Sequence, residues 1–253
     1  CADVVYPNYQ DWAYVRVKLD DNSFAIAKNK LSSVSDPLLR AMLWQNFWDG
    51  VTDGYFPLND LFKIVFQHAP SEADDALLGQ ILNQAVVALD ALTRMAPNSI
   101  YTAQTALDVE RMTWAGVQMN KTNNNLLRRW LTAHINTARS KTAMENLLAL
   151  LNGKMSFDLM PIDQDLRWKI ITQLNRMNYA GSLELIEAER AIDNSDRGQA
   201  SAVAATVIRP DAAIKTQWLN QIYDIQTKLT NTSIRASMEN LYPNEPTNLI
   251  ETT

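Results

Sequence analysis

Cysteine, glycine and histidine are all scarce in this chain of 253 residues. It contains one cysteine, Cys1, seven glycines, and two histidines, His68 and His134. A single cysteine excludes an internal disulfide framework. It also suits a reducing compartment, so we expect a cytoplasmic protein, although the periplasm is compatible as well. The low glycine content, beside abundant leucine, alanine, asparagine and glutamine, favours a helical fold.

Concentrated positive charge and long apolar runs are also missing. The formal net charge is -5 at pH 7, and Arg128-Arg129 is the only adjacent basic pair, which we interpret as a solvated helix face. A nucleic-acid surface needs a basic stripe, and a membrane helix needs a run of about 20 apolar residues. We therefore expect no nucleic-acid partner and no membrane span.

The first twenty residues differ in pattern from all that follow. Residues 12–19 alternate strictly between two faces, one of which carries Ala13, Val15, Val17 and Leu19. Period-two alternation predicts a half-buried strand, and residues 3–6 would supply a hairpin partner. A two-stranded hairpin is marginal by itself. We therefore expect residues 1–20 to be the end of an upstream β-sandwich or a linking strand, and the chain to be an excised piece.

From about residue 21 the apolar residues recur at helical spacing. Ser-Asp-Pro at residues 35–37 is typical of a helix start, and Asn-Gly at residues 152–153 is typical of a helix end. The apolar spacing and such boundary signals predict helices at residues 37–50, 57–65, 71–96, 103–119, 126–135, 142–151, 166–177, 183–192, 199–208, 212–229 and 233–241. Short polar turns join them, and no fixed-period consensus is visible. We predict an all-α fold, an irregular α-solenoid of stacked helical hairpins similar to HEAT or armadillo arrays.

Three segments near the C-terminus carry more specific motifs. Residues 163–168 read DQDLRW, residues 193–200 read DNSDRGQA, and residues 209–218 read RPDAAIKTQW. In this order they resemble the helical C-terminal domain of aminopeptidase N, a zinc metallo-aminopeptidase of the gluzincin type. The match is closest to bacterial members whose domain is similar to that of the ER aminopeptidases. Residues 12–20 and 36–44 also fit that family, whereas residues 97–160 match only in pattern.

The resemblance implies a larger enzyme that removes N-terminal amino acids from peptides. It places zinc, the catalytic glutamate and the amine-binding loop in domains that precede Cys1, and the chain itself has no H-E-x-x-H motif. Residues 21–253 are expected to form a non-catalytic helical domain that caps the active site and encloses the peptide chamber. The expected partners are the upstream catalytic domain of the same polypeptide and peptide substrates.

We assign no catalytic, cofactor-binding or metal-binding residue to this chain. His68 is expected to cap a helix C-terminus, and His134 to be an ordinary surface or core histidine. Glu72, Asp74 and Asp75 are expected to complement a helix N-terminus. Residues 143–146 (AMEN) and 237–240 (SMEN) echo the M-E-N part of the family's amine-binding loop, but both lie inside predicted helices and are given no role.

Polar residues of the DQDLRW segment are expected to be structural. Asp165 and Arg167 are near neighbours on a helix and point apart, so each should pair with another helix. If any side chain meets a peptide, we expect an arginine or lysine facing a substrate carboxylate, which the sequence does not identify.

Two other functions stay open at this point. A stand-alone α-solenoid adaptor would bind another protein in its groove, although the amphipathic strand at 12–19 counts against it. An all-α enzyme with its own site is the weakest alternative, because no convergent set of ionisable residues is visible.

Overall fold

The computed structural model describes residues 4–243, and the regular secondary structure of these residues is helical. Their α-helices are α1 (Asp21–Lys30), α2 (Pro37–Thr52), α3 (Leu58–His68), α4 (Asp75–Met95), α5 (Ile100–Met119), α6 (Asn124–Thr137), α7 (Lys141–Leu151), α8 (Gln164–Arg176), α9 (Ser182–Ile192), α10 (Asp196–Val207), α11 (Ala212–Tyr223) and α12 (Asn231–Asn240). Three 3-10 turns accompany them: η1 (Tyr9–Asp11), η2 (Leu31–Ser33) and η3 (Ala69–Ser71). The all-α prediction is confirmed.

Side-chain caps explain where most of these helices begin. At ten of the twelve N-termini, a Ser, Thr, Asp or Asn side chain accepts a hydrogen bond from a backbone N–H of the first turn. Each such cap stabilises its helix by about 1 kcal/mol. The helix starts are therefore encoded locally, which is why the sequence pattern locates them well.

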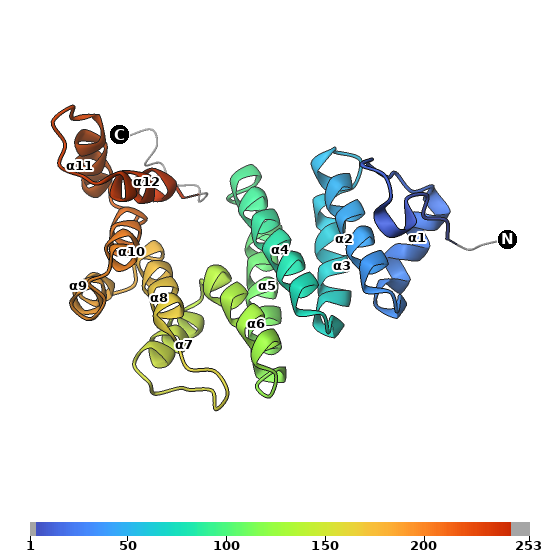
Figure 1. The fold of residues 1–253 in the computed structure, drawn as a ribbon, viewed down its shortest axis with the longest axis horizontal. Helices are drawn as coiled ribbons and strands as arrows, with labels where there is room; N and C mark the ends of the chain where they lie inside the picture. Colours follow the sequence, from blue (N-terminus) through green and yellow to red (C-terminus); the bar gives the residue numbers. More distant parts are fainter. Residues whose placement is uncertain (1–3, 244–253) are drawn as a thin grey trace.

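The helices are arranged in an elongated molecule with α1 near one end and α11 near the other (Figure 1). From α4 onward each even-numbered helix packs against the next one, giving the row α4, α6, α8, α10 and α12. The odd-numbered helices α5, α7 and α9 pack against members of that row. We refer to α4, α6, α8, α10 and α12 as the even row.

A single apolar core runs through most of the chain. It extends from Leu19 to Ala205 and includes the fully buried Trp44, Phe47 and Trp130. A second, smaller cluster of Val203, Val207 and Leu241 holds the last two helices, with Trp218, Leu219 and Ala236 packed against it. The C-terminal helices are thus attached by much less apolar surface than the helices before them.

The predicted strand does not form. Residues 15–20 are irregular, and no β-strand occurs within residues 4–243, where one isolated bridge joins Phe157 and Met160. A strand requires a hydrogen-bonded neighbour, and residues 4–6 supply none, since the Val5 N–H donates instead to Ser23 Oγ at 3.0 Å. Asp3, part of the predicted hairpin, lies outside the described residues.

The predicted alternation is visible in the burial of this segment only from residue 16 onward. Leu19 is buried and Val17 is half-buried, and the Val17 carbonyl accepts a hydrogen bond from Asn46. Trp12, Tyr14 and Val15 are exposed, at 84%, 111% and 60% of their surface. The segment therefore docks only its C-terminal half on α2.

Two helix limits differ from the sequence-based prediction by more than three residues. The long helix was predicted to begin with a capping box at Ser71, but Ser71 lies in η3 and Asp74 caps α4 by accepting from the Leu77 N–H at 2.9 Å. The helix predicted to reach residue 229 ends at Tyr223, because Asp224 Oδ1 accepts from the Gln226 N–H and turns the chain.

One helix of residues 4–243, α4, is long and apolar enough to cross a bilayer by length and composition alone. Its Leu78, Ile81 and Leu89 are buried in the core, which is equally typical of the central helix of a folded domain. Its apolar character is therefore explained by packing.

Candidate functional site

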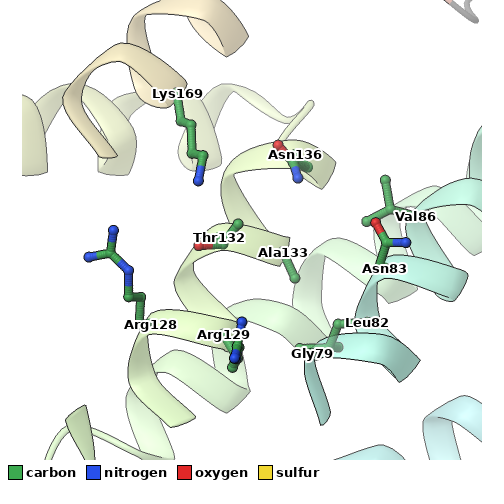
Figure 2. A pocket seen from close by; sticks show the side chains of 10 residues that line it. All are labelled: Gly79, Leu82, Asn83, Val86, Arg128, Arg129, Thr132, Ala133, Asn136 and Lys169. Atoms are coloured by element: carbon green, nitrogen blue, oxygen red, sulfur yellow. The ribbon is translucent and has the colours of Figure 1, made fainter. Parts of the chain in front are cut away.

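A cavity of about 310 Å³ lies on the face of the even row, between α4, α6 and α8. Residues at helical spacing on each helix point into it (Figure 2). They are Gly79, Leu82, Asn83 and Val86 from α4, Arg128, Arg129, Thr132, Ala133 and Asn136 from α6, and Lys169 from α8. Three cationic side chains thus converge on one cavity from two helices.

A second cavity of about 500 Å³ continues along the even row and shares Asn136 and Lys169 with the first. It is lined mainly by α8 and α10 side chains, among them Trp168, Arg176 and Arg197. We call the two cavities together the even-row groove. Its lining includes five cationic and two anionic residues, whereas the whole chain carries a net charge of -5. The lining is therefore rich in cations, and carboxylates at its edge, Asp163, Asp75 and Asp90, pair with three of them.

Asp165 organises the charges of the even-row groove. One of its carboxylate oxygens lies 2.7 Å from Lys169 Nζ and 3.4 Å from the Arg128 guanidinium, and the other lies 2.7 Å from Arg197. It thereby links α6, α8 and α10. Lys169 and Arg197 therefore share one carboxylate, with Arg128 as a third and more distant partner.

The two arginines of α6 are held differently. Arg128 also pairs with Asp163 at 2.6 Å. Burial by itself raises the pKa of Asp163, but the hydrogen bonds from Arg128 and from the Leu166 N–H outweigh it and hold that pKa below its usual value. Arg129 pairs with Asp75 at 3.5 Å, a longer contact that leaves more of its guanidinium facing the cavity. Both side chains are solvent-accessible, at 40% and 47%, as expected for a solvated helix face, and they also line the cavity.

The DQDLRW segment builds the start of α8. Asp163 caps the helix by accepting from the Leu166 N–H at 3.0 Å. Arg167 forms a forked pair with the buried Glu189 of α9, at 2.7 and 2.5 Å. The prediction that Asp165 and Arg167 pair with other helices is confirmed, although Asp165 also pairs with Lys169 on its own helix.

The DNSDRGQA segment folds into a tight cap for α10. Ser195 Oγ accepts from the Gly198 N–H at 3.1 Å, while Asp193 accepts from Ser195 and from Trp168 Nε1 at 2.8 Å. A Cβ at Gly198 would lie 2.3 Å from the Asp193 carbonyl oxygen. Glycine is needed there because the backbone of the turn folds back on the helix.

The RPDAAIKTQW segment joins α10 to α11. Arg209 donates to Asn175 at 2.6 Å and to Ser182 at 2.8 Å, which ties it to the turn between α8 and α9. Asp211 caps α11, and Lys215, which is 1% exposed, donates to the Val207 carbonyl near the end of α10. Burial lowers the pKa of Lys215 to about 8. All three motifs are thus structural, and the first two also place side chains in the groove.

Neither histidine lies in the groove. His68 is 5% exposed, and its ring contacts Ser32 and the Lys28 carbonyl in the last turn of α1, so it caps the C-terminus of α1 and not that of its own helix α3. His134 is a core residue, 1% exposed, with Nδ1 3.2 Å from Thr113 Oγ1. Within residues 4–243, no three His, Cys, Asp or Glu side chains come together in a way that would hold a metal ion.

The acidic cluster of Glu72, Asp74 and Asp75 caps α4 and also forms an ion pair with α2. Asp74 is the cap, and Glu72 pairs with Arg40 of α2 through contacts of 3.0 and 2.9 Å. The AMEN and SMEN segments lie in α7 and α12, as predicted.

Comparison with known proteins agrees with these motifs. Residues 4–250 match the family model of the ERAP1-like C-terminal domain. The chain is also similar to Aminopeptidase N of Streptomyces lividans, with 26% identity over 219 residues. That alignment covers 85% of this chain and 24% of the relative, so the chain spans about a quarter of the length of the curated protein it matches. On this evidence of motif and sequence, the chain belongs to the ERAP1-like C-terminal domain family.

Proposed function

We propose that this chain is the non-catalytic C-terminal domain of a zinc-dependent aminopeptidase that removes N-terminal amino acids from peptides. The family match over residues 4–250 carries the proposal, and the similarity to an aminopeptidase N supports it. Residues 21–253 would be the helical domain. Residues 1–20 would mark the end of an upstream β-sandwich, which agrees with the exposed Trp12, Tyr14 and Val15.

The side chains of residues 4–243 do not fit a zinc site. Of the two histidines, His134 is buried in the core and His68 is bound to a serine and a carbonyl. Catalytic zinc in peptidases takes three protein ligands, commonly two His and one Glu. We therefore derive no step through zinc here. The metal and its general base would belong to another domain of the same polypeptide.

The contribution of this domain would be to shape the space around the peptide. The row of successive even-numbered helices with odd-numbered helices packed against it supports an irregular α-solenoid. A solenoid presents an extended surface, and here the even-row groove lies on one face of it. We infer that this face closes the peptide chamber above the active site.

The cationic side chains of the even-row groove suit the far end of a peptide. A peptide bound by its N-terminal amine at the active site carries a free carboxylate at the other end. Arginine binds carboxylates through charge-assisted hydrogen bonds, and Arg129 has only a 3.5 Å contact to Asp75 within the described residues. We infer that Arg129, with Arg128 and Lys169 beside it, receives the substrate carboxylate.

The absence of peptidase chemistry in this chain is directly testable. We expect the purified 253-residue chain to hydrolyse no aminoacyl anilide, with or without added zinc, because the proposal places the zinc ligands in another domain. The measurement is release of the aniline chromophore over hours at high protein concentration. Turnover that rises with zinc would contradict the proposal.

The role of Arg129 is tested in the complete enzyme with matched peptides that end in a free carboxylate or an amide. Arg129→Gln should raise KM for the free acid about tenfold, the value of one charge-assisted hydrogen bond, and leave KM for the amide unchanged. The control is Arg235→Gln on α12, whose side chain is 82% exposed and pairs with Glu239 outside the groove.

Equal effects on both peptides would remove Arg129 from carboxylate binding while leaving the domain assignment intact. Binding of an unrelated protein, with no effect on hydrolysis, would instead favour the adaptor that the sequence leaves open.

A further inference from the structure

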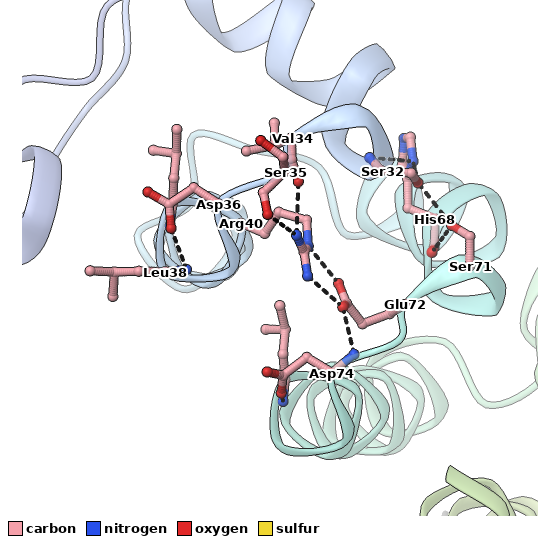
Figure 3. Close-up of polar contacts among 12 residues, drawn as sticks. Ser32, Val34, Ser35, Asp36, Leu38, Arg40, His68, Ser71, Glu72 and Asp74 are labelled. Carbon is pink, nitrogen blue, oxygen red and sulfur yellow. Dashed lines mark hydrogen bonds and ion pairs between the residues drawn. The ribbon is translucent and has the colours of Figure 1, made fainter. Parts of the chain in front are cut away.

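A serine, a histidine and a second serine meet away from the even-row groove, where η2, the end of α3 and η3 converge (Figure 3). Ser32 Oγ lies 2.5 Å from His68 Nδ1. On the other side of the ring, His68 Nε2 lies 2.9 Å from the Lys28 carbonyl oxygen. Ser71 Oγ donates to Ser32 Oγ at 3.0 Å.

These contacts determine the tautomer of His68. A carbonyl oxygen only accepts, so Nε2 must carry the ring hydrogen and Nδ1 must carry the lone pair. The Ser32 hydroxyl therefore donates to Nδ1. A serine that donates to a neutral imidazole, whose other nitrogen is oriented by a fixed acceptor, has the arrangement of an activated nucleophile and its base. Here a backbone carbonyl occupies the orienting position.

Solvent exposure also differs between the two side chains, because a nucleophile must be reached by its substrate whereas its base must be held in place. Ser32 is exposed, whereas His68 is 5% exposed and held in place. Both line a cavity of about 230 Å³ with Leu31, Val34, Trp44 and Ala73. Arg40 and Glu72 also line it, but they form a forked pair with each other, so their charges cancel. The cavity is small, has both polar and apolar walls, and is electrically balanced, which fits a short neutral acyl group.

We propose that Ser32 is a nucleophilic serine that takes the acyl group of small neutral esters, with His68 as its general base. Ser32 Oγ attacks the carbonyl carbon as its proton passes to His68 Nδ1. The bond to the ester oxygen then breaks, and the alcohol leaves with that proton. Water, deprotonated by the same nitrogen, hydrolyses the acyl-serine to release the acid and restore the Ser32 hydroxyl.

The direct test is covalent labelling of the full 253-residue chain with an alkyl fluorophosphonate. Ser32 Oγ would bond to phosphorus, fluoride would leave, and the proton would pass through His68 to solvent. Peptide mapping by mass spectrometry should find the label on Ser32 and not on Ser33. Ser33 is the matched control, because it is exposed next to Ser32 but donates to the Lys30 carbonyl at 2.6 Å.

Single-residue variants then distinguish activation of the Ser32 hydroxyl by His68 from simple exposure of that hydroxyl to solvent. Ser32→Ala should abolish labelling, Ser33→Ala should leave it unchanged, and His68→Gln should slow it about 100-fold, the usual size of general-base catalysis. Glutamine keeps hydrogen-bonding groups at position 68 but lacks a basic nitrogen. Equal labelling of Ser32 and Ser33 in the unmodified chain would overturn the proposal, and this comparison stands even if His68→Gln does not fold.

Turnover distinguishes this site from any zinc peptidase activity. Hydrolysis of p-nitrophenyl acetate by the same chain should persist in a metal chelator and disappear in Ser32→Ala. Hydrolysis that survives Ser32→Ala would also overturn the proposal. Neither result bears on the assignment of the chain as an aminopeptidase domain, because that assignment places the metal chemistry in another domain.

Discussion

His134 is a residue whose burial ties stability to pH. It is 1% exposed, its ring lies 4.8 Å from the ring of Trp114, and its Nε2 is buried with no hydrogen-bond partner among the described residues. Burial disfavours the charged form, and the nearby Glu110 only partly offsets this, so the pKa falls from 6.5 to about 4. The imidazole is therefore neutral in the folded protein at pH 7.

The pKa of His134 predicts a loss of stability in mild acid. The unfolded chain binds a proton at about pH 6.5 and the folded chain only near pH 4, so stability is full above the higher value and falls as pH drops between the two. The loss is about 3 kcal/mol in the free energy of unfolding. Urea unfolding at several pH values should show it. The matched variant His134→Gln lacks this titration, and an unchanged pH dependence in that variant would refute the assignment.

At the scale of elements, the closest helix contact is that of α5 with α6. Gly116 of α5 lies against Trp130 of α6, and a Cβ at position 116 would lie 2.1 Å from the indole. Trp130 is 1% exposed and has no space into which to move. The absent side chain at position 116 thus allows the two helices to approach.

Gly116→Ala should therefore destabilise the domain by about 3 kcal/mol, at the upper end of overpacking effects. Gly79→Ala on α4 is the matched control, because its Cβ would meet only the flexible Arg129 side chain, at 3.1 Å. There the gain in helix propensity should stabilise the protein by up to about 1 kcal/mol. Thermal unfolding of the two variants, measured side by side, should give shifts of opposite sign.

The comparison of sequence with structure also belongs to this scale. Helix starts were predicted well because a cap such as Asp36 before Pro37 acts within one turn of chain. The predicted strand does not form within residues 4–243, because alternation at residues 12–19 specifies two faces but supplies no hydrogen-bonding neighbour. The even-row groove was missed because it joins Gly79, Arg128 and Lys169, which only the packing of α4, α6 and α8 brings together.

Across the whole molecule, the apolar core is unevenly distributed. The helices up to α10 share one large cluster, whereas α11 and α12 depend on the small cluster around Val203, Val207 and Leu241. Within the described residues, the last two helices and their flanking turns contribute one buried apolar side chain to that cluster, Leu241. Local opening should therefore cost least free energy at this end.

Hydrogen exchange followed by mass spectrometry tests that gradient. Amides of α11 should exchange faster than those of α4, α6 and α8, because fewer buried contacts must be broken to expose them. Leu241→Ala should accelerate exchange in α12 and α10 with little effect on α4. Uniform protection along all helices would show instead that the domain opens as a single unit.

Asp165 limits which amino-acid substitutions the even-row groove can accept during evolution. Its carboxylate serves Arg128, Lys169 and Arg197 on three successive helices of the even row. Residues that share a partner do not vary independently in their energetic effects. A neutral replacement at position 165 would leave three cations facing one another, and tolerance would require matching changes on separate helices. Single substitutions can therefore reshape the walls of the groove more readily than they can reverse its charge.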